Sequence, residues 1–242
     1  MKILTTNGYS DLERLSDIEL YYSAPENFSE SSVKISGEEY KHISKVMRHK
    51  LGDELHITDG KGSIVKGNIS GLQIDSAVIE IREIYKYENK FKNITFCVPK
   101  LRNPNRFEFG LEKCTELGIT NFIIYESLRT VAKGTKIDRW EKILLSAMKQ
   151  SLRSFLPEIK ILNSINDIMN LKGEKIIFEQ NCERRFSEFQ REKSTQYYFI
   201  FGPEGGLDKE EIESAKSVNV FNLDENRLRS ETAIVKCASM LG

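Results

Sequence analysis

The sequence predicts a two-domain protein, in which a small strand-rich domain precedes an α/β domain built on a parallel sheet. Three observations lead to this expectation. The chain has 242 residues, more than one domain of roughly 150 residues usually holds. Its first third reads as strands around a hairpin turn, and from residue 92 onward strands alternate with helices. Such alternation is typical of a parallel sheet covered on both faces. We therefore expect an unassigned extension over residues 1–17, a β-domain over 18–89 and an α/β domain over 90–242.

In the first domain, alternating apolar residues predict the strands, and the Asp59-Gly60 turn predicts a hairpin. One helix should interrupt them, because Ser36 and Glu39 have the spacing of a capping box. Tyr40, Ile43, Val46 and Met47 then recur at helical spacing. A charged linker is expected over residues 85–91. The expected strands cover residues 18–23, 53–59, 63–70 and 77–85.

In the second domain, apolar runs predict strands and apolar residues at helical spacing predict helices. Gly118 should end the first helix as a C′ residue, and Pro157 should stop the second, which Asp138 and Glu141 cap. Asp208 and Glu211 should open a third helix, and Ser230 the last one. The expected strands cover residues 94–99, 121–127, 175–180, 197–202 and 218–223.

Composition narrows the possible functions. The chain has 36 basic and 36 acidic residues and is 39% hydrophobic, which indicates a folded protein rather than a disordered one. It has neither an apolar run of about 18 residues nor a signal-peptide pattern, so we expect a cytoplasmic protein without a membrane span. The 4 cysteines lie far apart and the histidines straddle a helix and a strand, so buried free thiols and no metal site are expected.

The net charge of zero hides a regional asymmetry. Residues 1–89 carry 11 basic and 15 acidic side chains, a net charge of −4, whereas residues 90–157 carry 13 and 6, a net charge of +7. Residues 158–242 carry 12 and 15, a net charge of −3. A basic middle segment indicates contact with phosphates, and a solvated basic face without a partner explains it about equally well.

Two loops that follow expected strands stand out, because ligands of open parallel sheets bind beyond the carboxyl ends of the strands. The first is Gly202-Pro203-Glu204-Gly205-Gly206, whose glycines allow close approach of the backbone to a ligand. It is neither a GxGxxG nor a P-loop pattern, and a tight turn without a ligand also explains it. The second loop runs from Leu223 to Ala233. Ordinary capping explains Ser230 and Glu231 there, but not the arginines at positions 227 and 229.

Together these loops resemble a known family. GPEGGL followed by LRSETA is similar to the bacterial small-subunit ribosomal RNA uridine-N3 methyltransferases of the RsmE type, a branch of the SPOUT superfamily. Further similarity lies in Lys45-Val46-Met47-Arg48, in Thr58 to Gly62, in Lys113 to Gly118, and in the segment from Ala147 through Gln150, Ser151 and Arg153 to Pro157. The resemblance covers the chain from about residue 18 to its end.

The chain also departs from the family pattern. Asp224, Asn226 and Arg227 stand where the family commonly has Gly, Arg and Ile. Glu19 stands where many members have an arginine, which leaves RNA contacts by that strand in doubt. These departures keep a second possibility open, namely an RNA-binding module with a degenerate methyltransferase fold and no catalysis.

The resemblance implies a PUA-like β-barrel followed by a SPOUT-type α/β domain with a trefoil knot, acting as a homodimer with S-adenosylmethionine as cofactor. It implies methylation of N3 of a uridine in 16S ribosomal RNA, the RNA of the small ribosomal subunit. The cofactor-binding residues would come from both loops: Gly202, Pro203, Glu204, Gly205, Gly206, Leu223, Leu228, Arg229, Ser230, Glu231, Thr232 and Ala233.

For catalysis, we expect Arg229 to stabilise the uracil anion electrostatically, and Glu231 is the weaker candidate for proton acceptor. The RNA is expected on the basic middle segment, where each residue could equally belong to a solvated helix face. The expected RNA-binding residues are Lys100, Arg102, Arg106, Lys113, Arg129, Lys133 and Arg153.

Overall fold

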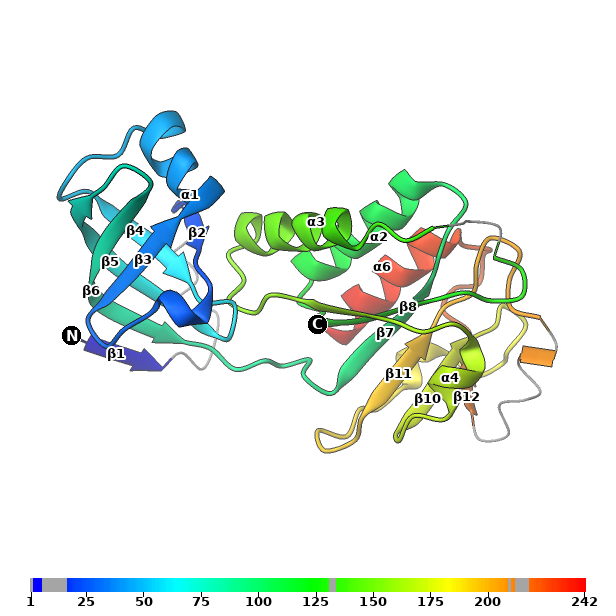
Figure 1. Cartoon of the computed structure of the whole chain (residues 1–242). Helices are drawn as coiled ribbons and strands as arrows, with labels where there is room; N and C mark the ends of the chain where they lie inside the picture. Colours follow the sequence, from blue (N-terminus) through cyan, green and yellow to red (C-terminus); the bar gives the residue numbers. More distant parts are fainter. Residues whose placement is uncertain (1, 6–16, 131–133, 209, 212–217) are drawn as a thin grey trace. The chain divides into compact units, whose positions relative to one another are not determined.

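The computed structural model describes residues 2–5, 17–130, 134–208, 210–211 and 218–242. The chain forms two compact units (Figure 1). The first comprises Met1–Asn89 together with Met148–Leu156, and the second comprises Lys90–Ala147 together with Pro157–Gly242. The segment Met148–Leu156 therefore belongs to the first unit, although the expected boundary at residues 89 and 90 places it in the second.

The first unit is a six-stranded sheet with the order β1-β6-β5-β4-β2, in which β3 also pairs with β6. Strands β4 and β5 form the predicted hairpin, and β5 pairs antiparallel with both β4 and β6, whereas β4 pairs in parallel with β2. The sequence did not predict β1 or β3. Strand β1 pairs with β6 in parallel, and β3 pairs with β6 antiparallel. The strands are β1 (Lys2–Thr5), β2 (Leu20–Tyr22), β3 (Ser32–Ser36), β4 (Glu54–Thr58), β5 (Ser63–Leu72) and β6 (Ser76–Lys86). A short 3-10 helix, η2 (Pro25–Asn27), lies between β2 and β3.

The helix predicted after Ser36 differs from the expectation in three ways. It consists of α1 (Gly37–Lys41) and a π-helical turn, η3 (His42–Val46). The Ser36 side chain makes no capping hydrogen bond, so the predicted capping box is wrong. Glu39 instead forms an ion pair with Lys149, with 2.5 Å between Oε1 and Nζ. Val46 and Met47 were expected on the buried face, but they are 64% and 45% exposed, because the wider π-turn rotates them away from the buried Ile43.

The segment Met148–Leu156 is hydrogen-bonded to the turn of the predicted hairpin. The Gly62 amide donates to the Ser154 carbonyl at 2.9 Å, and the Leu156 amide donates to the Gly60 carbonyl at 3.0 Å. Gly62 has a φ of +108°, and a Cβ at this position would lie 2.6 Å from the ring of Phe155. Glycine is therefore required at position 62 for two reasons: the left-handed backbone conformation and the close approach of the Phe155 ring.

We expect Gly62→Ala to destabilise the first unit by about 1–3 kcal/mol, because it adds a methyl group against Phe155 at a left-handed backbone position. The single tryptophan, Trp140, belongs to the second unit, so hydrogen exchange of the β4 and β5 amides is the suitable measurement. Gly71→Ala is the matched control, since the nearest atom to its Cβ is 3.9 Å away. Equal loss of protection in both variants would contradict this account.

The second unit is a parallel six-stranded sheet with the order β12-β10-β11-β7-β8-β9. The predicted strands and most helices of this unit are confirmed, while β9 and α4 were not predicted. The helix expected after Asp208 lies largely outside the described residues. The strands are β7 (Ile94–Pro99), β8 (Asn121–Tyr125), β9 (Glu158–Ile161), β10 (Glu174–Phe178), β11 (Tyr197–Ile200) and β12 (Val218–Phe221). The helices are α2 (Pro104–Glu116), α3 (Ile137–Gln150), α4 (Ile165–Met169), the 3-10 turn η4 (Phe186–Glu188) and α6 (Ser230–Leu241).

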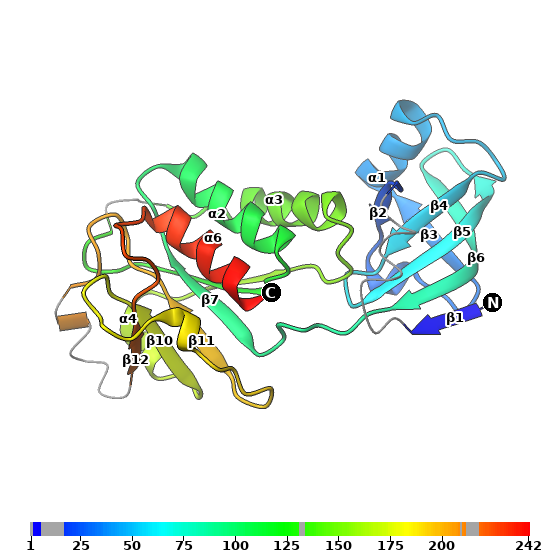
Figure 2. The same cartoon turned by 180° about the vertical axis from the view of Figure 1, so that it is seen from behind.

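Helices cover both faces of this sheet, as predicted. Apolar residues of α2, α3 and α6 share one core with Phe96, Phe122 and Phe199. On the opposite face, Ile165 and Ile168 of α4 pack in a second core with Cys97. Helices α2 and α6 pack against each other, as Figure 2 shows from behind. Helix α3 ends at Gln150, seven residues before the expected stop at Pro157, and Leu152 beyond it has a φ of +54°.

Three of the four cysteines, Cys97, Cys114 and Cys237, are buried free thiols as predicted, and Cys182 is half-buried. Burial raises the pKa of these three thiols, so they stay protonated and act as small apolar side chains. No helix in the described part of the chain is long and apolar enough to cross a membrane.

Candidate functional site

The strand order of the second unit changes direction between β7 and β11. From β7 the chain moves through β8 to β9 on one side, and then returns to place β11 on the other side of β7. In open α/β sheets ligands bind at such a switch point, beyond the carboxyl ends of the strands. The loops after β7 and β11 meet there, since the Arg102 amide donates to Glu204 Oε1 at 3.0 Å.

The loop after β11 is the predicted glycine-rich loop, and its conformation depends on Gly202. The Gly206 amide donates to the Pro203 carbonyl at 2.9 Å and closes a tight turn. A Cβ at Gly202 would lie 3.1 Å from the Leu207 nitrogen and 3.3 Å from Gly206, so a larger residue would push this turn outward. The Tyr125 hydroxyl, whose pKa burial raises well above its usual value, donates to the Phe201 carbonyl at 2.6 Å.

The loop after β8 also supports the glycine loop. The Arg129 guanidinium donates to the Gly205 carbonyl at 2.8 Å and pairs with Asp208 at 2.9 Å. The buried Glu211 accepts the Leu128 and Asp208 amides at 2.9 Å and 2.8 Å. Tyr125 and Glu211 were not predicted as site residues, although both are polar residues at the borders of these loops, which is a signal that could have identified them.

The last loop reaches the glycine loop through Ser230. Its Oγ donates to the Gly202 carbonyl at 2.7 Å. The N-cap of α6 is Arg229, which makes no side-chain capping bond, so the expectation that Ser230 is the N-cap is wrong. The serine hydroxyl therefore joins the two predicted loops, instead of satisfying the helix terminus.

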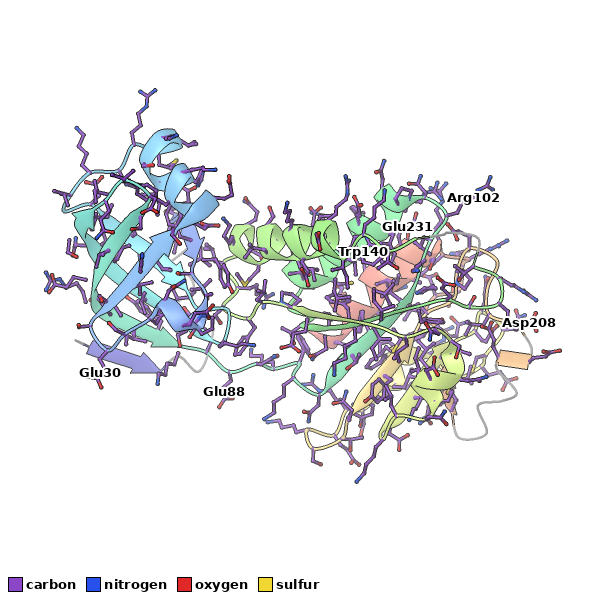
Figure 3. All side chains as sticks on the ribbon, in the orientation of Figure 1. Glu30, Glu88, Arg102, Trp140, Asp208 and Glu231 are labelled. Atoms are coloured by element: carbon purple, nitrogen blue, oxygen red, sulfur yellow. The ribbon has the colours of Figure 1, made fainter. Side chains whose placement is uncertain are left out.

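Glu231 is buried at the start of α6 and only partly satisfied. The residue is 7% exposed, and its Oε1 lies 3.5 Å from Arg106 Nε. Its Oε2 has no hydrogen-bond partner. A buried carboxylate oxygen without a donor is costly, so this atom is suited to receive a donor from a ligand. Arg229 is exposed, and its side chain forms no hydrogen bond or ion pair with the described residues. Figure 3 labels Glu231 and Arg102 at the same end of the unit, with Asp208 from the glycine loop.

The departures at positions 224–227 stabilise the last loop from within. Asp224 pairs with Lys236 of α6 and accepts the Asn226 amide at 2.8 Å. The Lys236 side chain and this amide hold the pKa of Asp224 below its ordinary value. Arg227 is exposed. Asp224 and Asn226 therefore form a turn that is hydrogen-bonded within the loop and paired with α6.

A cavity of about 500 Å³ lies beside this loop and is separate from the glycine loop. Of the predicted cofactor residues only Leu223 lines it. Its other lining residues come mainly from the segment after β10 and from α6, among them Cys182, Arg185, Phe186, Lys236 and Met240. The other apolar residue predicted for the cofactor, Leu228, is half-buried against the core, as is Ala233.

The residues expected to bind RNA are in different environments. Lys100 is 6% exposed and donates to Glu126 and Thr135, so it is not available to a phosphate and the expectation for it is corrected. Lys113 pairs with Glu112 and Glu116. Arg153 is exposed and lies in the first unit. Lys133 lies outside the described residues. The side chain of Arg102 is exposed, whereas Arg106 and Arg129 are engaged as described above.

A parallel sheet with two joined loops at its switch point defines an α/β domain that binds a nucleotide-like ligand. Comparison with known proteins gives the family. The family described as RNA methyltransferase domain matches residues 88–242, and the RNA methyltransferase PUA domain matches residues 35–82. The chain therefore belongs to the RNA methyltransferase family, and the resemblance to the RsmE type is confirmed.

Named relatives and solved structures support the same family. The "Ribosomal RNA small subunit methyltransferase E" of Bacillus subtilis is 26% identical over 217 residues, which cover 82% of this chain and 85% of that protein. The methyltransferase E structure from Neisseria gonorrhoeae, bound to S-adenosyl methionine, is 26% identical with a TM-score of 0.81, covering 92% of this chain and 95% of that one. A probable rRNA-methyltransferase from Porphyromonas gingivalis is 28% identical with a TM-score of 0.80, covering 92% and 96%.

Proposed function

We propose that this chain transfers a methyl group from S-adenosylmethionine to N3 of a uridine in 16S ribosomal RNA. The observation that carries the proposal is the hydrogen bond from Ser230 to the Gly202 carbonyl, which joins the two loops beside the buried Glu231. Family membership and the names of the relatives support RNA methylation in the small subunit. The choice of N3 rests on the resemblance of GPEGGL and LRSETA to the uridine-N3 enzymes.

The residues present fit this cofactor. A Cβ at Gly202 would lie 3.1 Å from the Leu207 nitrogen, so a side chain there would displace the loop that we assign to the cofactor. The unpartnered Oε2 of Glu231 is a buried acceptor with room for one donor, either a group of the cofactor or, as assigned below, N3–H of uracil. The buried Leu223 and the half-buried Leu228 supply apolar surface for a base. We assign cofactor binding to Gly202 through Gly206, to Leu223 and to Leu228 through Ala233, with Arg229 contributing its backbone and not its guanidinium.

The chain's own residues then have two catalytic tasks. S-Adenosylmethionine supplies an electrophilic methyl group when it is bound. N3 of uracil must lose its proton, and negative charge then spreads onto the carbonyl oxygens. We assign the stabilisation of this charge to the guanidinium of Arg229, which is exposed and makes no ion pair in the part of the chain that the structure describes. We assign proton acceptance to Glu231, whose carboxylate has a free acceptor oxygen.

Three architectural expectations belong to the same proposal: a closed PUA-like barrel, a trefoil knot and a homodimer. The PUA match supports the first. For the knot, Asn222 exchanges backbone hydrogen bonds with Arg184 and Phe186, while Ser230 bonds to Gly202. The end of the chain thus contacts two earlier loops, as a threaded segment would. The homodimer rests on the family resemblance alone.

The proposal is tested by incubating the protein with methyl-labelled S-adenosylmethionine and two substrates, unmodified 16S RNA transcribed in vitro and undermethylated small subunits. Label in RNA with either substrate supports catalysis, and the difference between them identifies the preferred substrate. A folded protein that binds RNA but transfers no label to either would favour the non-catalytic RNA-binding module.

A further inference from the structure

The turn after β8 carries an arginine to which the proposed chemistry gives no task. Arg129 was expected to bind RNA, but its guanidinium already has two partners, the Gly205 carbonyl at 2.8 Å and the Asp208 carboxylate at 2.9 Å. Both partners follow β11, and Gly205 lies 76 positions further along the chain than Arg129. The arginine therefore acts on the glycine loop, instead of extending into solvent.

The Gly205 carbonyl belongs to a peptide group that is held at both ends. The other end is the Gly206 amide, which donates to the Pro203 carbonyl at 2.9 Å. Glycine has more backbone freedom than any other residue, and this peptide group joins two glycines. Gly206 also has a φ of +73°, in the left-handed region. Arg129 and the turn together therefore fix a peptide group that the sequence itself leaves flexible.

A closed ring of contacts holds Arg129 in this position. Glu211 is 5% exposed, and its two carboxylate oxygens accept the amides of Leu128 and Asp208 at 2.9 Å and 2.8 Å. Leu128 precedes Arg129 in the chain and Asp208 pairs with the Arg129 guanidinium, so the contacts return to the same residue. The guanidinium is thus directed at the glycine loop by a buried carboxylate.

The turn that carries Arg129 is also anchored at its base. The Thr130 amide donates to the Ser127 carbonyl at 2.9 Å, and the Ser127 amide donates to Thr130 Oγ1 at 2.9 Å. The buried Lys100 donates to Glu126, before the turn, at 2.7 Å and to Thr135, after it, at 3.2 Å. Two cations that were expected to bind RNA therefore stabilise this loop instead.

We propose that Arg129 is a positioning residue, which orders the glycine loop for S-adenosylmethionine by fixing the Gly205 carbonyl. A loop that already has its bound conformation loses less conformational entropy when the ligand binds. Removal of Arg129 therefore weakens cofactor binding and leaves the chemical step and RNA binding unchanged. The inference rests on the proposed function, since it takes the glycine loop as the cofactor site.

The test combines two binding measurements on the full chain. Calorimetric titration gives the affinity for S-adenosylmethionine, and fluorescence anisotropy with unmodified 16S RNA gives the RNA affinity over a range of salt concentrations. Arg129→Ala removes both contacts, whereas Arg129→Lys keeps the charge and loses the planar fork that serves two acceptors. Arg82→Ala is the matched control, because Arg82 is also exposed and is ion-paired with Glu80 at 3.1 Å.

We expect Arg129→Ala to bind S-adenosylmethionine about tenfold more weakly, because the free loop is no longer ordered. The KM for the cofactor should rise by a similar factor, whereas kcat at saturating cofactor should stay that of the wild type. RNA affinity, its salt dependence and the thermal midpoint of Trp140 fluorescence should also be unchanged. Arg129→Lys should fall between the wild type and Arg129→Ala, and Arg82→Ala should keep the wild-type cofactor affinity.

Unchanged cofactor affinity in Arg129→Ala, or an equal loss in Arg82→Ala, would overturn the assignment. Weaker RNA binding, with a slope of log K against log salt that is lower by about 0.7, would instead make Arg129 a phosphate contact. A lower kcat at saturating cofactor would overturn it as well, since Arg129 would then act in the chemical step. A wild-type protein that binds no S-adenosylmethionine would refute the cofactor site and the proposed function. A wild-type protein that binds and uses it, with an indistinguishable Arg129→Ala variant, would refute only the role of Arg129.

Discussion

Arg229→Ala is expected to lower the turnover of methyl transfer by about 10²-fold to 10³-fold, the usual effect of losing one donor to a developing oxyanion. The affinity for S-adenosylmethionine should change by less than about threefold, since the task assigned to this guanidinium arises only as charge develops on uracil. The side chain is exposed at the N-cap of α6 and makes no capping bond, so its removal should leave the fold intact. Single-turnover kinetics and calorimetric titration measure the two quantities separately.

Arg227→Ala is the matched control for this prediction. Arg227 is also exposed, lies two residues away in the same loop and forms no side-chain hydrogen bond or ion pair with any described residue. It should keep turnover within a few-fold of the wild type. Equal losses of turnover and cofactor affinity in Arg229→Ala, or equal losses of turnover in both variants, would refute the assignment to Arg229.

Gly202→Ala should weaken the binding of S-adenosylmethionine by at least about tenfold, which corresponds to about 1.4 kcal/mol of binding free energy. The added Cβ would lie 3.1 Å from the Leu207 nitrogen and 3.3 Å from Gly206, so the turn that faces the ligand must move. The hydrogen bond from Ser230 to the Gly202 carbonyl would be disturbed at the same time. Calorimetric titration measures the affinity, and the thermal midpoint of Trp140 fluorescence confirms that the second unit is folded.

Gly205→Ala tests whether any added side chain in the glycine loop weakens cofactor binding, or only one at Gly202. A Cβ at Gly205 would lie 3.5 Å from Arg129 Cδ, which is ordinary van der Waals contact. The fold of the Gly205→Ala variant should therefore tolerate the change, and its affinity for S-adenosylmethionine should fall less than that of Gly202→Ala. If Gly205→Ala loses more affinity, the glycine loop contacts the ligand through Gly205 and the role given to Gly202 is wrong.

The sequence predicted the α/β domain well because its strands and helices carry strong periodic patterns. Strand β7, with the sequence ITFCVP, is buried along its whole length, and α3 buries Trp140 and Leu144 as its spacing indicates. Strand β1 carries no comparable pattern, and in β3 only Val33 and Ile35 alternate with polar residues, so both short strands depend on pairing with β6. Pairing between distant segments is a tertiary effect that local patterns do not contain.

The sequence predicted the two loops of the candidate site, but not the contacts that several residues make. Local rules made Ser230 an N-cap, whereas its hydroxyl donates to a carbonyl that lies 28 residues earlier in the chain. Lys100 looked like a phosphate contact because lysine is usually exposed, but its ammonium group pairs with Glu126 at 2.7 Å. Val46 and Met47 looked like core residues because a regular helix was assumed, and the π-turn exposes them. In each case a long-range partner or an irregular backbone overrides the local preference.

The most direct measurement is to identify the nucleoside that the protein methylates. Unmodified 16S RNA or small subunits are incubated with labelled S-adenosylmethionine, the RNA is digested to nucleosides, and these are separated by chromatography with mass detection. The proposed function predicts a single labelled product, 3-methyluridine, whose yield falls about 10²-fold or more with Arg229→Ala. Label in another base, at another atom of uridine, or in no nucleoside at all would contradict it.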